Sequence, residues 1–173
     1  MNRLFDKKFI LPVFALVIVI DQIIKFFIIE KVPTEGIFLL KSKILTFSIE
    51  NQVNEGIAFG IGLPRTAIYF FVTLIILALV MICVKEIKDG RRRTGFILSI
   101  LIAGAVSNLI DRLLYGGVVD YLSLSFFKFS WPTFNLADVM IVGGAVGVLG
   151  MVIFKSKVHL RLVPRSGSEK GPK

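Results

Sequence analysis

The sequence contains very few residues of the types that build disulfides, metal centres and nucleophilic triads. Among 173 residues there is one cysteine, Cys83, and one histidine, His159. A single thiol cannot form an internal disulfide, and most zinc sites and Ser–His pairs require clustered His or Cys side chains. The glycine patterns that bind nucleotide phosphates are also absent. We therefore expect no metal, no cofactor and no thiol or Ser–His chemistry.

Polar residues are scarce over four long stretches of the chain. The composition is 55% hydrophobic, with a mean hydropathy of +0.80, which predicts an integral membrane protein. Four runs are long enough to cross about 30 Å of hydrocarbon as helices. The first run lacks a small-residue cleavage site, so it is interpreted as a span and not as a removable signal peptide. The predicted spans are roughly 9–29, 66–84, 95–114 and 135–154.

The net charge of +9 is concentrated at the N-terminus, in the segment 85–93 and after residue 154. With four spans these three regions lie on one side of the membrane, and the positive-inside rule predicts that they are cytoplasmic. The segments 35–62 and 115–134 then face outward. We interpret the basic excess as a determinant of topology that contacts anionic membrane lipids, and we expect no nucleic-acid binding.

The two outward segments differ in character. Residues 44–50 alternate, with Leu45, Phe47 and Ile49 on one face, which predicts a strand. The fold expected is therefore an all-α membrane protein of four transmembrane helices with a small β-sheet on the outer membrane surface. The segment 115–134 is rich in aromatic residues, which favours an interfacial anchor. The alternative is a mobile flap hinged at its two glycines.

One domain is expected, covering residues 1–155, with an unstructured cytoplasmic tail at 156–173 that includes a thrombin-like sequence at 162–165. Small residues in spans three and four predict close helix packing. In span four these are Gly143, Gly144, Gly147 and Gly150, and in span three Ser99, Ala103, Gly104 and Ser107.

Two carboxylates, Asp120 and Asp138, lie beside apolar runs at the outer ends of the spans. Because a carboxylate near hydrocarbon is costly, it favours a functional interpretation. In span one Asp21 and Lys25 are four residues apart and can pair, either as a structural ion pair or as part of a site. Further polar residues map to the same outer half of the membrane: Asn54, Asn108, Asp111, Arg112 and Asn135.

Two chemical interpretations of this polar set remain open. Two close carboxylates can share a proton and activate water, one as base and the other as acid, as in an aspartic protease. Alternatively, the protein is a small transporter or lipid-binding scaffold whose buried charges only pair with one another. Nothing in the sequence requires more than a monomer.

Five stretches of this sequence together resemble the lipoprotein signal peptidase family, also called signal peptidase II. The resemblance extends from about residue 8 to residue 155, and the order and spacing of the stretches agree with the family. One difference is Ser107, which stands where the family usually has glycine. The matching stretches are Asp21–Lys25, Asn54–Gly60, Asn108–Arg112, Val118–Tyr121 and Phe134–Asp138.

The resemblance implies an aspartic endopeptidase of the bacterial cytoplasmic membrane, with both termini cytoplasmic and an outward-facing site. Such an enzyme removes signal peptides from prolipoproteins by cutting before a diacylglyceryl-modified cysteine, and it is inhibited by globomycin-type cyclic peptides. Asp120 and Asp138 would then be the catalytic pair. The supporting set would be Asp21, Lys25, Asn54, Asn108, Asp111, Arg112 and Asn135.

Overall fold

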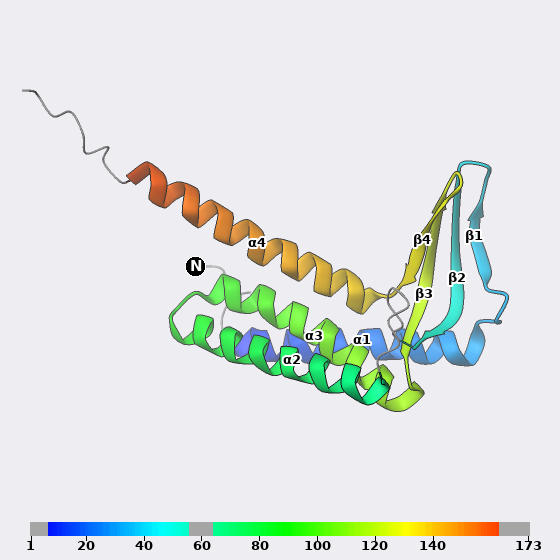
Figure 1. The fold of residues 1–173 in the computed structure, drawn as a ribbon, viewed down its shortest axis with the longest axis horizontal. Coiled ribbons are helices and arrows are strands. Elements are labelled where there is room, and N and C mark those ends of the chain that lie inside the picture. The colour runs from blue at the N-terminus through cyan, green and yellow to red at the C-terminus, as the bar shows by residue number, and fades with distance from the viewer. Residues whose placement is uncertain (1–6, 56–63, 163–173) are drawn as a thin grey trace, which may run out of the picture.

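The structure, a computed structural model, describes residues 7–55 and 64–162 and contains four helices and four strands in these ranges (Figure 1). The order along the chain is α1 (Lys7–Lys31), β1 (Ile37–Lys41), β2 (Leu45–Asn54), α2 (Arg65–Lys88), α3 (Arg92–Tyr115), β3 (Val118–Phe126), β4 (Phe129–Phe134) and α4 (Leu136–Leu162).

All four helices are long and apolar enough to cross a membrane, which confirms the predicted four-span architecture. The helices extend a few residues beyond the predicted spans. The difference is largest for α4, which continues to Leu162 and so includes the first part of the segment expected to be an unstructured tail. The remainder of that tail, residues 163–173, lies outside the described residues.

Helix α3 lies at the centre of the bundle and packs against α1, α2 and α4. Small residues allow this close approach. A Cβ atom on Gly104 would lie 2.5 Å from the carbonyl oxygen of Ala137, and one on Gly144 would lie 2.7 Å from Cβ of Leu101. The packing prediction holds only in part, because a Cβ on Gly143 or Gly150 would meet nothing within 4 Å.

The four strands form one antiparallel sheet in the order β1-β2-β3-β4, and they run across the helix axes at one end of the bundle (Figure 1). The predicted strand at 44–50 is confirmed as part of β2. The segment 115–134, expected to be an anchor or a flap, contributes β3 and β4 to the same sheet. Its two glycines have packing roles: Gly116 ends α3 with a φ of 75°, and Gly117 lies against the backbone of Asn54.

The first residues of β3 are buried between the rest of the sheet and the helices. Val119 is fully buried and packs with Tyr121 and with Ile28 of α1. Partly buried apolar side chains complete this cluster, among them Ile49 of β2 and Leu136 of α4. The cluster fixes β3 against α1 and against the first turn of α4, and it therefore positions the polar residues of those three elements relative to one another.

Candidate active site

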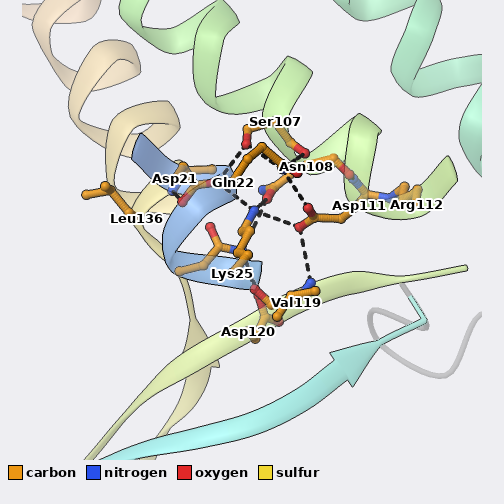
Figure 2. Close-up of polar contacts among 12 residues, drawn as sticks. Asp21, Gln22, Lys25, Ser107, Asn108, Asp111, Arg112, Val119, Asp120 and Leu136 are labelled. Atoms are coloured by element: carbon orange, nitrogen blue, oxygen red, sulfur yellow. Dashed lines mark hydrogen bonds and ion pairs between the residues drawn. The ribbon is translucent and has the colours of Figure 1, made fainter. Parts of the chain in front are cut away.

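The predicted polar residues meet where β3 crosses the ends of α1, α3 and α4. Figure 2 shows side chains from these elements turned toward one another, with Lys25 of α1 near the centre. Every residue of the predicted site takes part in one connected set of hydrogen bonds and ion pairs. The convergence expected from topology is thus present, even though the residues come from widely separated parts of the sequence.

Asp138 is held in the first turn of α4 by a reciprocal cap. The backbone N–H of Asp138 donates to Oδ1 of Asn135 at 2.9 Å, and the backbone N–H of Asn135 donates to Oδ2 of Asp138 at 3.1 Å. This is the capping-box arrangement, here built by an Asn-x-x-Asp sequence. The positive end of the helix dipole also stabilises a negative charge at this position. The local sequence therefore both starts α4 and fixes the Asp138 carboxylate.

Asp120 is held on β3 by two amide side chains. Asn135 Nδ2 donates to Oδ1 at 2.8 Å, and Asn54 Nδ2 donates to Oδ2 at 3.0 Å. The carboxyl group is only 3% exposed. Burial raises the pKa of Asp120 to about 6, the nearby charge of Asp138 adds to the increase, and the two amide hydrogen bonds oppose it. Both aspartates therefore contact Asn135. Asp120 bonds to the Asn135 side chain, and Asp138 bonds to both the side chain and the backbone of Asn135.

A buried ion cluster lies beside this pair. The ammonium group of Lys25 is 2.7 Å from a carboxylate oxygen of Asp21 and 2.7 Å from one of Asp111, and all three side chains are almost fully buried. The two carboxylates also reach other elements: the second oxygen of Asp21 accepts the N–H of Ala137 in α4, and the Asp111 oxygen that contacts Lys25 also accepts the N–H of Val119 in β3. The Asp21–Lys25 pair is thus a structural ion pair that also adjoins the site.

Asn108 links the ion cluster to the aspartate pair. Its Oδ1 accepts from Lys25 Nζ at 2.8 Å and from Asn135 Nδ2 at 3.2 Å, while its Nδ2 donates to Oδ1 of Asp138 at 2.8 Å. Lysine can only donate, so Lys25 fixes which end of the Asn108 amide faces it. The NH₂ group of Asn108 must then face Asp138. The backbone carbonyl of Asn108 in turn accepts from Arg112 at 3.0 Å.

Lys25 does not have the surroundings of a general base. A lysine ammonium has three donors, and here three acceptors surround it: Asp21, Asp111 and Asn108. These contacts engage all three donors of Lys25, which leaves the two aspartates as the acid–base candidates.

Three residues of the site were not predicted from sequence. Ser107 donates its hydroxyl to Oδ2 of Asp21 at 2.7 Å, and Gln22 donates to the Ser107 hydroxyl at 2.9 Å and to Asp111 at 2.8 Å (Figure 2). The hydroxyl of Tyr121 accepts the N–H of Leu136, the first residue of α4. Burial raises the pKa of Tyr121 to about 12, so this hydroxyl stays protonated. Gln22 and Tyr121 lie within stretches that resemble the family, and Ser107 is a departure from its pattern, but no local pattern assigns any of the three its contacts.

Comparison with known proteins identifies the family to which this sequence is similar. A family model described as signal peptidase (SPase) II matches residues 13–154. The lipoprotein signal peptidase of Staphylococcus carnosus is 34% identical over 82% of this chain and 87% of its own length. That of Chlamydia trachomatis serovar D is 38% identical over 63% of this chain, and the match spans 66% of that protein's length.

Solved structures show the same fold. One, described as a bacterial membrane enzyme, superposes with a TM-score of 0.72 at 28% identity and covers 84% of this chain and 93% of its own. The family match includes all five stretches on which the sequence resemblance rested. The chain therefore belongs to the signal peptidase II family.

Proposed function

We propose that this protein is an aspartic endopeptidase that removes signal peptides from prolipoproteins, cutting before the diacylglyceryl-modified cysteine. The observation that carries the proposal is the pair of carboxylates joined through Asn135: Asp120 bonds to its side chain and Asp138 to its backbone and side chain. Two carboxyl groups in such a pair perform acid–base catalysis when one is protonated and the other ionised.

The surroundings of the two groups support different roles. Asp138 accepts N–H donors from Asn108 and from the Asn135 backbone and lies at the positive end of α4. With these donors holding it in place, Asp138 serves as the base that takes a proton from water. Asp120 is the more deeply buried carboxyl, with a raised pKa, and this favours the protonated form. It serves as the acid that donates to the scissile carbonyl oxygen.

The supporting residues then have positioning roles. Lys25 orients Asn108, which donates to Asp138, and Asn54 orients Asp120. Asp21 and Asp111 neutralise Lys25 and bind backbone N–H groups of α4 and β3. Because these contacts already exist in the free protein, little reorganisation is needed during the reaction.

Placement in the membrane follows from the charge distribution. The end of the bundle that holds the aspartates is opposite the basic α2–α3 connection, where Lys88 and Arg92 lie. The positive-inside rule then places the aspartates and the sheet on the outer side of the bacterial cytoplasmic membrane, with both termini cytoplasmic. A lipid-modified prolipoprotein would reach them from the bilayer, and globomycin-type cyclic peptides would bind over the pair. We propose a monomer as the functional unit.

The competing hypothesis, a scaffold or transporter whose buried charges only neutralise one another, explains part of the cluster. It explains Asp21 and Asp111, which both pair with Lys25. Among the described residues, however, neither Asp120 nor Asp138 forms an ion pair with a lysine or arginine within 4.0 Å. Asp120 is buried and Asp138 is partly buried, and holding two such carboxylates close together without a paired cation is costly, which favours a catalytic role.

The test is cleavage of a synthetic prolipoprotein peptide by the purified protein in lipid. We expect the wild type to cut a diacylglyceryl-modified peptide before its cysteine and to leave the unmodified peptide intact. Asp120→Asn and Asp138→Asn should each abolish cleavage, while the exposed control Asp89→Asn should cut normally. Full activity in either site variant would refute the dyad, and equal cleavage of both peptides would refute the proposed specificity.

A further inference from the structure

The sheet has one apolar and one polar face. Side chains alternate along β3, and directly opposed residues on antiparallel strands share a face. On the polar face Thr46 pairs with Ser125, which pairs with Ser130. The apolar face carries Leu45, Phe47 and Ile49 of β2, Leu122, Leu124 and Phe126 of β3, and Phe129 and Trp131 of β4.

Only the part of the apolar face next to the bundle is covered by protein. Ile49 and Leu122 pack in the cluster around Ile28 of α1. Farther along the strands the sheet extends sideways past the helices (Figure 1), and there Phe126 and Trp131 are 55% and 57% exposed. Exposed aromatic side chains gathered on one face mark a contact surface.

At the start of β3 this apolar face is continuous with the active-site residues at the end of the bundle. Asp120, Leu122, Leu124 and Phe126 follow one another at alternate positions of β3, so they share a face. Asp120 on this face reaches Asn135 at the start of α4. The exposed aromatic side chains farther along the strands therefore lie on the same face of the sheet as Asp120.

The two hairpin tips of the sheet form a single unit. The N–H of Phe127, between β3 and β4, donates to the carbonyl of Ile44, between β1 and β2, at 2.7 Å. Phe127 has a φ of 53°, a left-handed conformation that is unfavourable for a bulky side chain. It nevertheless keeps an aromatic ring at the tip, 65% exposed and in edge contact with Phe126.

The part of the sheet beyond the bundle is also basic. Residues 37–49 and 121–134 contain Lys41, Lys43 and Lys128 and no aspartate or glutamate. Lys43 and Lys128 lie at the two tips and are exposed, whereas Lys41 lies over the ring of Phe38. Lysines beside aromatic rings are typical of surfaces that contact the headgroups and the acyl boundary of anionic membranes.

We propose that this overhang, the apolar face of the sheet beyond the bundle together with its two basic tips, is a docking surface for anionic phospholipids of the adjacent leaflet. Phe126, Phe129 and Trp131 enter the interfacial layer, and Lys43 and Lys128 contact lipid phosphates. Docking holds the sheet against the bilayer, and with it Asp120 at the base of β3, at the depth where a lipid-anchored peptide would be cut.

The protein carries its own reporter, because Trp131 is its single tryptophan. We would reconstitute the unaltered chain into nanodiscs whose lipids have brominated acyl chains and measure quenching of its fluorescence. We expect strong quenching, greater with phosphatidylglycerol than with phosphatidylcholine. The matched control is Trp131→Phe/Ser130→Trp, which moves the indole by one residue to the polar face and should escape bromine quenching but remain open to aqueous acrylamide.

Three results would overturn the proposal. Weak bromine quenching of Trp131 together with free access to acrylamide would show that the face is exposed to water. Protection of Trp131 from both quenchers would show that a protein partner or a second copy covers it. Equal quenching in the two lipids, unchanged by Lys43→Gln/Lys128→Gln, would refute the headgroup contact. None of these readouts depends on peptide cleavage, so they are independent of the proposed enzymatic activity.

Discussion

Replacing Lys25 by methionine should destabilise the protein more than any other single substitution of a charged residue. Lys25 is 1% exposed and lies 2.7 Å from a carboxylate oxygen of both Asp21 and Asp111, which are fully buried. Methionine preserves the length of the side chain and removes the charge. Two carboxylates then remain in the bundle with no cation between them, and Asn108 loses the donor that orients its amide.

The magnitude follows from the cost of an unpaired buried charge. Removing one partner from a buried ion pair costs about 3–5 kcal/mol, whereas replacing all the partners together costs much less. For a domain of this size, each kcal/mol corresponds to roughly 2–4 °C in the midpoint of thermal unfolding. We therefore expect Lys25→Met to lower the midpoint by about 10 °C. Adding Asp21→Asn and Asp111→Asn to Lys25→Met should recover part of this loss.

The single buried thiol provides the assay. Cys83 is 6% exposed, so a thiol-reactive fluorophore reports its exposure as the detergent-solubilised protein unfolds. Lys31→Met, at the exposed end of the same helix, is the matched control and should leave the midpoint unchanged. If Lys25→Met were as stable as this control, or if the triple variant were less stable than Lys25→Met alone, the reasoning about the ion cluster would be wrong.

Three further predictions concern stability and use the same assay. Ser107→Ala removes a hydrogen bond to the Asp21 carboxylate and should cost about 1–3 kcal/mol, whereas Ser99→Ala, whose hydroxyl bonds only within its own helix, should cost less; equal losses would contradict a special role for Ser107. Gly104→Ala should cost about 1–3 kcal/mol because its Cβ would meet the Ala137 carbonyl, whereas Gly143→Ala, with open space around it, should be neutral or stabilising. The pKa of Asp120 is raised in the folded protein, so the free energy of unfolding should fall as the pH rises from about 4 to about 6. At pH 8 the free energy of unfolding of Asp120→Asn should exceed that of the wild type by up to about 3 kcal/mol. A stability advantage of the same size at pH 4 would contradict this linkage.

The spans and the site residues could be predicted from the sequence because each rests on a strong physical signal. Long apolar runs have few alternatives to spanning a membrane, and carboxylates beside them are costly enough to indicate function. The Asn135–Asp138 spacing also encodes its own cap. These signals are local, so they can be recognised without the tertiary structure.

The sheet was only half predicted because the signal is weaker there. Residues 44–50 alternate regularly, but the run Phe126-Phe127-Lys128-Phe129 obscures the alternation of β3 and β4. The pairing of β3 with β2 joins residues from 64 (Asn54 and Val118) to 81 (Leu45 and Phe126) positions apart, and no local pattern records such contacts. The roles of Gln22 and Ser107 were missed for the same reason, since both depend on the packing of α1 against α3.

The pH dependence of kcat/KM for cleavage of the lipidated peptide shows whether Asp120 and Asp138 act as an acid–base pair. In such a pair Asp138 takes a proton and Asp120 donates one, so we expect a bell-shaped profile. Its alkaline limb should lie near the raised pKa of Asp120, about 6 in the free protein. A rate that stays constant from pH 4 to pH 9 would refute the acid–base pair.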